Sequence, residues 1–308
     1  MSRKRQRGVA VITALLVVAV AASAATLMLA QQSAMLDQTM LVASRAQAEV
    51  YAQAGLDWAR GVLLQDGKST STDNLAELWA QPIVGMPIER AVVAGDIADE
   101  QGRFNLNNVV LGNNARSEPD IQVLRRLLTL AGLAPELADA VVDWIDFDDD
   151  LASGAGAEGG YYLGLPRPYR AANAPMVQVD ELYRVRGFDA AAVARLRPYV
   201  TAIRERTTIN VNTAPDLVIA AMLDTTRDKA AEVLAERARK PFADKPGFSA
   251  AAGRAGLTAT GEYDVKSSWF SARIQVAQDD VQLATEALMK RDAAARGATT
   301  IIWRRPLF

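Results

Sequence analysis

The residues of this chain that could do chemistry are oxygen ligands, because its 308 residues include neither cysteine nor histidine. Their absence removes thiol catalysis, disulfides, the Ser-His-Asp triad and the usual ligands of transition metals. Catalysis would have to rely on carboxylates, lysine or metal-bound water. The composition therefore predicts a protein that is not an enzyme, with no catalytic residue.

One stretch, DWIDFDDDLASGAGAEGGYY, gathers carboxylates. Asp146, Asp148 and Asp150 alternate at the expected end of a helix, and Glu158 follows a glycine-rich turn. Negative charge at a helix C-terminus is unfavourable, so this grouping needs a reason. Hard oxygen ligands on a flexible loop suit calcium better than magnesium. Loop aspartates can also simply be solvated, and the residues alone leave both interpretations open.

The spacing of these carboxylates differs from that of an EF-hand loop. With Asp146 as the first position, aspartates fill the first, third and fifth positions. The sixth position holds Leu151 where an EF-hand has glycine, and Glu158 falls one residue beyond the twelfth. A calcium site here would have another geometry. A calcium-dependent hydrolase is a rival hypothesis, and loss of activity on replacing Asp148 would support it.

The elements that must position this loop begin with a segment long enough to cross a membrane. Basic residues within positions 3–7 precede Gly8, and no charge follows from Val9 to Ala30. As a helix this run measures roughly 33 Å, which spans a bilayer. The basic flank stays in the cytoplasm, so the rest of the chain is expected to be exported. A secretory signal that is cleaved and discarded near AASAA is the alternative.

The helical pattern continues beyond the apolar run. There is no proline up to residue 65, and no heptad seam of the kind a coiled coil requires. We therefore predict one helix of about fifty residues within 9–65, with its first half in lipid and its second half packed on a soluble domain. The apolar positions near helical spacing are Met35, Leu36, Met40, Ala43, Ala46, Val50, Ala54, Leu56 and Leu63.

A short basic leader, a glycine and an apolar helix with an amphipathic continuation resemble a type IV prepilin or pseudopilin. The resemblance implies that a prepilin peptidase cuts between Gly8 and Val9 and methylates Val9. Most members have glutamate at the fifth mature position, where this chain has Thr13. A carboxylate in the bilayer is costly unless paired, and in the family it is thought to pair with a neighbouring subunit's terminal amine. A subunit without it suits the tip of a filament, and an anchor that never assembles would also tolerate Thr13.

The rest of the chain predicts an α+β fold in which a pilin-like domain with an antiparallel sheet is interrupted by a large all-α insertion. Strand-like alternation occurs in PIERAVVAGDI and ADEQGRFNLNNV, and again in SSWFSARIQVAQ, VQLATEALMKR and ATTIIWRRPLF. The predicted divisions are 1–8 as a prepilin leader, 9–65 as the N-terminal helix, 66–111 and 259–308 as the two parts of the pilin-like domain, and 112–258 as the insertion.

The predicted insertion contains a near-repeat of helix pairs that looks like helix-hairpin-helix or SAM-like units. Asn-x-Asn precedes such a pair twice, at Asn105 and Asn107 and at Asn210 and Asn212, where the amides could cap a helix or close an Asx turn. An exported DNA-binding or DNA-uptake protein is therefore the alternative function. The hairpins lack the Gly-x-Gly that holds a phosphate, and residues 9–308 carry a net charge of −6. We expect protein contacts and no nucleic acid.

Taken in order along the chain, the leader without a fifth-position glutamate, VVDWIDFDDD, GAEGGYY, RPYRAANAPM, VDELYRVRGF, RLRPYVT and INVNTAP resemble the minor pseudopilin K family of type II secretion systems. The resemblance implies calcium at Asp146, Asp148 and Glu158, with Asp150 and Asn173 as further ligands. It also implies an inner-membrane protein with its bulk in the periplasm. The implied partners are the minor pseudopilins I and J at the tip of the pseudopilus.

Overall fold

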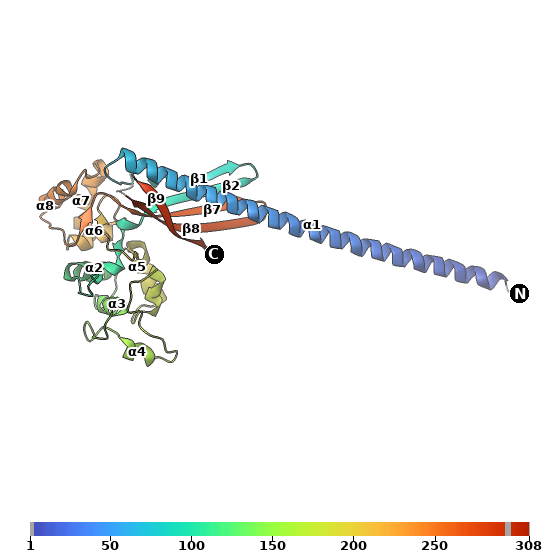
Figure 1. The fold of residues 1–308 in the computed structure, drawn as a ribbon, viewed down its shortest axis with the longest axis horizontal. Helices are drawn as coiled ribbons and strands as arrows, with labels where there is room; N and C mark the ends of the chain where they lie inside the picture. Colours follow the sequence, from blue (N-terminus) through green and yellow to red (C-terminus); the bar gives the residue numbers. More distant parts are fainter. Residues whose placement is uncertain (1–2, 293–296, 308) are drawn as a thin grey trace.

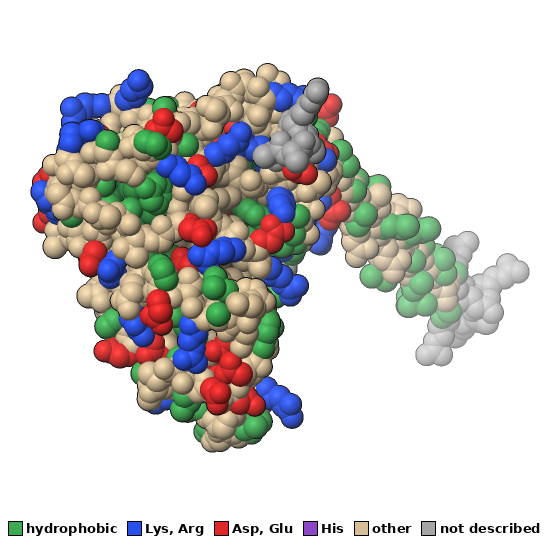
Figure 2. Space-filling view, turned by 60° about the vertical axis from the view of Figure 1, so that its left-hand side comes forward, with side chains coloured by type: hydrophobic (Ala, Val, Ile, Leu, Met, Phe, Trp, Pro, Cys, Tyr) green, Lys and Arg blue, Asp and Glu red, His purple; other side chains and the backbone are tan. Residues whose placement is uncertain are grey.

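The computed structural model describes residues 3–292 and 297–307, and one helix dominates its shape (Figure 1). Helix α1 (Arg3–Ser69) is longer than the predicted helix at both ends. Its first half projects away from the body, and Figure 2 shows hydrophobic side chains covering this projecting part. Within the described residues, α1 is the one helix long and apolar enough to cross a membrane. A single membrane anchor is compatible with this arrangement.

The second half of α1 lies against an antiparallel sheet with the strand order β1-β2-β7-β8-β9. Strands from both ends of the chain meet in this sheet, because β2 pairs with β7 along its whole length. The antiparallel sheet and its long helix confirm the mixed α and β character predicted from the sequence. The strands are β1 (Ile83–Ile88), β2 (Ala91–Asp99), β7 (Trp269–Gln278), β8 (Val281–Asp292) and β9 (Ala298–Leu307).

Small side chains let α1 approach the sheet closely. The fully buried positions of its second half recur at intervals of three or four residues, as one helix face requires. Gly55 is needed in this row, since a Cβ there would lie 2.9 Å from Cγ2 of Ile274. Among the apolar positions near helical spacing, Leu56 and Leu63 are buried, whereas Val50 lies two residues from Ala48 on the opposite side of the helix and is 65% exposed. The buried row is Ala48, Ala52, Leu56, Ala59 and Leu63.

Between β2 and β7 the chain forms a mainly helical part, which we call the helical region (residues 100–268). It hangs beside the sheet, with α4 at the end farthest from it (Figure 1). Its helices are α2 (Glu118–Leu130), α3 (Leu137–Ile145), α4 (Gly159–Leu163), α5 (Ala190–Leu196), α6 (Asp216–Met222), α7 (Arg227–Arg239) and α8 (Lys245–Arg254), with 3-10 turns at Glu100–Gly102, Leu106–Val109, Val179–Arg184 and Arg197–Tyr199.

Two short parallel strand pairs divide the helical region into two stretches. Strand β3 (Phe104–Asn105) pairs with β4 (Val200–Thr201), and β5 (Ile209–Asn210) pairs with β6 (Tyr263–Asp264). Each stretch starts and ends at one of these pairs and encloses a set of helices. The first stretch also contains the acidic loop.

Both Asn-x-Asn motifs use their amides in the same way. The first asparagine accepts a hydrogen bond from the backbone N–H two residues on, at 3.2 Å for Asn105 and 3.0 Å for Asn210, as an Asx turn requires. The second asparagine bonds both the N–H and the C=O of one distant residue. Asn107 does so with Met176, at 2.7 and 2.9 Å, and Asn212 with Phe242, at 2.8 and 2.9 Å. These amides thus hold the backbone at Met176 and Phe242, in segments outside the helices, against the Asn-x-Asn turns.

Two large hydrophobic clusters of buried side chains correspond to the two parts of the molecule. One joins α1 to the sheet, and the other fills the helical region from Phe104 to Val265. Along the chain, buried side chains pass from the first cluster to the second near β3 and return to the first just before β7. The predicted insertion, 112–258, falls inside the second cluster, and its exact limits stay a prediction.

Candidate metal centre

The acidic loop (residues 146–158) starts at the end of α3, a helix that is buried from Ala138 to Ile145. Asp143 lies in the last turn, and Asp146 follows it in extended backbone directly after the helix. A spacing of three residues puts both carboxylates on one side of the chain. The helix end thus presents two acidic side chains to the same space, with 0% and 1% of their surface exposed.

The loop then folds back so that Glu158 reaches the same space. The backbone N–H of Ala152 donates to Oδ1 of Asp143 at 2.7 Å, which fixes the turn. Farther on, a Cβ on Gly156 would lie only 2.0 Å from Oδ2 of Asp143, so the chain can pass there only as glycine. Glu158 follows directly before α4 and is 6% exposed.

Asp143, Asp146 and Glu158 each offer a carboxylate oxygen, and these atoms all lie within 4.8 Å of one another. Buried polar atoms in proteins are nearly always hydrogen-bonded, so exceptions require an explanation. Here the exceptions concentrate in one place. Of the seven buried side-chain oxygens that have no hydrogen bond among the described residues, five belong to these three carboxylates: Asp143 Oδ2, both oxygens of Asp146 and both oxygens of Glu158. A sixth is Oδ1 of Asn173, in the segment after α4.

Burial and mutual repulsion shift the titration of these groups. Burial, with the charges of Asp143 and Asp146, raises the pKa of Glu158 to about 8. Burial, with the charges of Asp148 and Asp143, raises the pKa of Asp146 to about 6, and burial also raises the pKa of Asp143. Such shifts mean that the ionised cluster lacks sufficient positive charge. A bound cation would supply it.

Arg116 is the guanidinium nearest to the cluster, and it does not satisfy it. Its Nη2 lies 3.5 Å from Oδ2 of Asp146 and 3.9 Å from Oδ1 of Asp143, and it donates a hydrogen bond instead to the backbone oxygen of Asp150 at 3.0 Å. One third of the side chain is exposed. Arg116 therefore neutralises one of three charges from the rim.

The residues predicted as ligands divide into two groups in the structure. Asp146, Glu158 and Asn173 direct unbonded oxygens into buried space. Asp148 instead accepts from Nδ2 of Asn114 at 2.8 Å and from the N–H of Asp150 at 2.9 Å, and the side chain of Asp150 is exposed. Asp143 was not predicted as a ligand from the sequence, because it lies within the apolar helical pattern ADAVVDWI. Its three-residue spacing from Asp146 was the available signal.

The donor set fits a hard cation. Carboxylate oxygens with an amide oxygen beside them are the ligands calcium takes, in flexible loops and without strict geometry. Magnesium demands a tighter octahedron and retains water, which a closed acidic loop serves less well. The arrangement can hold a cation and tie Glu158 to the end of α3.

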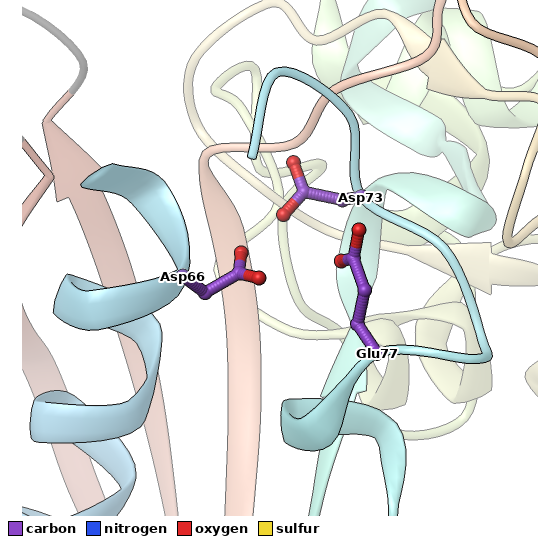
Figure 3. A group of neighbouring side chains, drawn as sticks. All are labelled: Asp66, Asp73 and Glu77. Atoms are coloured by element: carbon purple, nitrogen blue, oxygen red, sulfur yellow. The ribbon is translucent and has the colours of Figure 1, made fainter. Parts of the chain in front are cut away.

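A second acidic group, Asp66, Asp73 and Glu77, lies where α1 ends (Figure 3). Here a guanidinium already fills the place of a cation. Arg291 donates to Oδ2 of Asp66 at 2.7 Å and to Oδ2 of Asp73 at 2.6 Å. Glu77 accepts from the indole Nε1 of Trp79 at 2.7 Å. This group is a buried ion-pair network, and we assign no metal to it.

Comparison with known proteins adds two matches within the helical region. Two family models, both described as type II secretion system protein K, match residues 102–205 and 209–267. A type II secretion system protein K from Aeromonas hydrophila is 33% identical, over 94% of each chain. This chain belongs to the type II secretion system protein K family.

A second member, from Pseudomonas aeruginosa, is 34% identical over 94% of this chain and 90% of its own. Among solved structures, the GspK-GspI-GspJ complex from enterotoxigenic Escherichia coli matches with a TM-score of 0.77, over 88% of this chain and 99% of the matched chain, at 24% identity. That likeness supports the fold. The resemblance predicted from the sequence is thus confirmed, and the chain is a minor pseudopilin of type II secretion. Its family consists of structural subunits. Membership of this family favours a role in secretion over the alternative of DNA uptake.

Proposed function

We propose that this chain is the tip subunit of a type II secretion pseudopilus, anchored in the inner membrane with its bulk in the periplasm, where it starts or caps assembly. Its partners would be the minor pseudopilins I and J. The observation that carries the proposal is helix α1, whose first half projects from the body, together with membership of the protein K family. The helical region would correspond to helix-hairpin-helix or SAM-like units used for packing against protein.

Thr13 supports a place at the tip. Its hydroxyl donates to backbone oxygens of its own helix, at 3.1 Å to Val9 and 3.0 Å to Ala10. The hydroxyl is therefore hydrogen-bonded within its own helix, and the side chain carries no charge that would attract the terminal amine of a subunit above it. A subunit of this kind can bind partners below it and none above.

This arrangement predicts the outcome of co-purification. The full chain, expressed in membranes with I and J, should be recovered with both partners, in a complex that contains one copy of it. A Thr13→Glu variant should be recovered with more than one copy per complex, since the carboxylate can then pair with a further subunit. A wild-type complex with several copies of this chain would contradict the tip position.

We further propose that the acidic cluster holds a structural calcium ion. Asp143, Asp146 and Glu158 would be the ligands, with Asn173 completing the set through its unbonded Oδ1. When bound, the ion supplies the positive charge that the buried carboxylates lack. Binding would then fix a loop of more than a dozen residues, whose ordering otherwise costs chain entropy.

Thermal unfolding of metal-stripped full-length protein tests this assignment. Calcium should raise the melting temperature of the wild type, and Asp146→Asn should abolish the rise. Asp280→Asn, which changes an exposed aspartate in the β7–β8 turn, is the matched control and should keep it. An identical melting curve with and without calcium in the wild type would overturn the proposal.

A further inference from the structure

A cleft of about 270 Å³ lies where the helical region meets the sheet. Its floor is the face of the sheet opposite α1, because side chains alternate along a strand. On β7, Phe270 and Ala272 pack toward α1, whereas Ser271 and Arg273 line the cleft. No part of the acidic loop or of α1 contributes to its lining.

Two rows of cross-strand neighbours form the floor. In the first, Arg273 on β7, Glu286 on β8 and Arg305 on β9 lie side by side in register. In the second, Leu288 pairs with Trp303. The floor thus combines a row of ion-paired side chains with an apolar pair.

Glu286 holds both arginines of the first row. It accepts from Nε of Arg273 at 3.1 Å and from Nε and Nη2 of Arg305 at 2.9 and 2.6 Å. Although burial alone would raise the pKa of Glu286, its ion pairs with Arg305 and Arg273 keep it below its ordinary value, so it stays ionised. The Arg305 guanidinium also lies 4.9 Å from the ring centre of Trp303.

The opposite wall comes from the helical region and repeats this pattern. Arg103 donates through Nη1 to both oxygens of Glu100, at 2.9 and 3.1 Å, and buried Glu100 is further held by the hydroxyls of Thr201 and Ser271 at 2.7 Å. Arg197 pairs with Asp180 at the rim. Four arginines therefore face three carboxylates across the cleft, which leaves a surplus of one positive charge.

These ion pairs leave arginine donors unused. Within residues 3–292 and 297–307, Arg273 makes no hydrogen bond through its two terminal nitrogens, and Arg103 makes none through Nε or Nη2. Half of the Arg273 side chain is exposed. These solvent-accessible N–H groups are available to a ligand. Fixed guanidinium forks with free N–H groups match the planar geometry of a carboxylate.

We propose that this cleft binds a carboxylate of another protein segment, with an apolar side chain of that segment against Trp303 and Leu288. The volume suits one or two residues of such a segment. The carboxylate can be that of an aspartate or glutamate side chain or of a chain end, because both present the same two oxygens. The site goes beyond the proposed function, since it needs neither the calcium ion nor the tip position.

Peptide binding to the full chain in detergent micelles tests the site, with calorimetry as the readout. The probes are acetyl-Gly-Asp-Leu-Gly-amide for a side-chain carboxylate and acetyl-Gly-Gly-Leu with a free C-terminus for a chain end. Their neutral counterparts carry asparagine and a terminal amide. We expect at least one acidic probe to bind about tenfold more tightly than its neutral counterpart, because a charge-assisted pair is lost in the latter. The probe that binds identifies the source.

The variant Arg273→Gln should weaken that binding by about tenfold, and Arg103→Gln should do so independently from the other wall. Arg90→Gln is the matched control, since Arg90 is an exposed arginine paired with a carboxylate, that of Asp279, outside the cleft. It should leave peptide binding unchanged. Equal affinity for acidic and neutral probes, or equal binding by wild type and both cleft variants, would overturn the proposal.

Discussion

At the scale of single residues, the acidic loop shows what a sequence can and cannot reveal about a site. Asp146 and Glu158 could be predicted, since they fall in a polar, glycine-rich stretch, whereas Asn173 was expected only from the family resemblance. Asp143 was missed because it lies in an apolar helical pattern, where an acidic residue looks like the solvent face. Asp148 follows Asp146 by only two residues, but the chain bends there, and the Asp148 carboxylate accepts hydrogen bonds from Asn114 and from the N–H of Asp150. The sequence locates the acidic stretch, but the path of the backbone determines which of its carboxylate oxygens face the buried space.

Gly156 provides a test of the loop that leaves every acidic residue in place. A Gly156→Ala change would put a methyl group into contact with Asp143, so the loop must move away from the end of α3. We expect calcium to stabilise this variant less than the wild type, by at least half of the wild-type shift in melting temperature. Gly160→Ala is the control, because a Cβ there meets nothing within 4 Å. Equal calcium shifts in G156A and wild type would contradict the loop geometry.

The titration of the cluster predicts a pH dependence. In the folded protein the pKa of Glu158 is raised to about 8 and that of Asp146 to about 6, so the protonated forms of both groups stabilise the metal-free fold. This contribution to stability is complete below the pKa values of the unfolded chain and is lost as pH rises through the pKa values of the folded protein. Calcium needs the ionised forms, so it should stabilise the protein more at pH 8 than at pH 5.5. Melting curves with and without calcium at both pH values check this, and a larger calcium effect at pH 5.5 would contradict it.

At the scale of elements, α1 is the most predictable part and its end the least. Length, hydropathy and the absence of proline predicted one helix, yet they placed its end at residue 65. The structure continues it to Ser69, where Asp66 meets Arg291 on β8, 225 residues away in sequence. A helical period also could not show which apolar residues face the sheet, since small Ala48 and Ala52 are buried and larger Val50 is not.

The Arg291 network predicts a stability effect at this scale. Arg291 is 3% exposed and bonds Asp66 and Asp73, and Asp73 is fully buried. Arg291→Gln would leave Asp73 without its counter-charge. Breaking a buried ion pair on one side costs about 3–5 kcal/mol, so the free energy of unfolding should fall by about that amount.

Urea unfolding of the full chain in micelles measures this change. Arg90→Gln, at an exposed pair, should change the free energy of unfolding by less than about 1 kcal/mol. If the two variants cost the same, the network does not tie α1 to the sheet in the way the geometry indicates.

At the scale of the whole molecule, buried polar contacts join the sheet with its long helix to the helical region. Asp99, at the end of β2, accepts from Asn210 at 2.9 Å and from Thr213 and Ser267, both at 2.6 Å. Burial raises its pKa to about 6. Strands near both ends of the chain predicted that the sheet is interrupted. Which polar residues join its two parts could not be predicted, because the partners lie more than a hundred residues apart.

The central claim is that the N-terminal helix is cut after Gly8, kept, and assembled with I and J. Native mass spectrometry tests it most directly, on the full chain co-expressed in membranes with prepilin peptidase, I and J. The account predicts a complex with both partners, in which this chain starts at Val9 and carries one added methyl group. A chain that retains residues 1–8, or one that starts near residue 25 and is recovered alone, would contradict it.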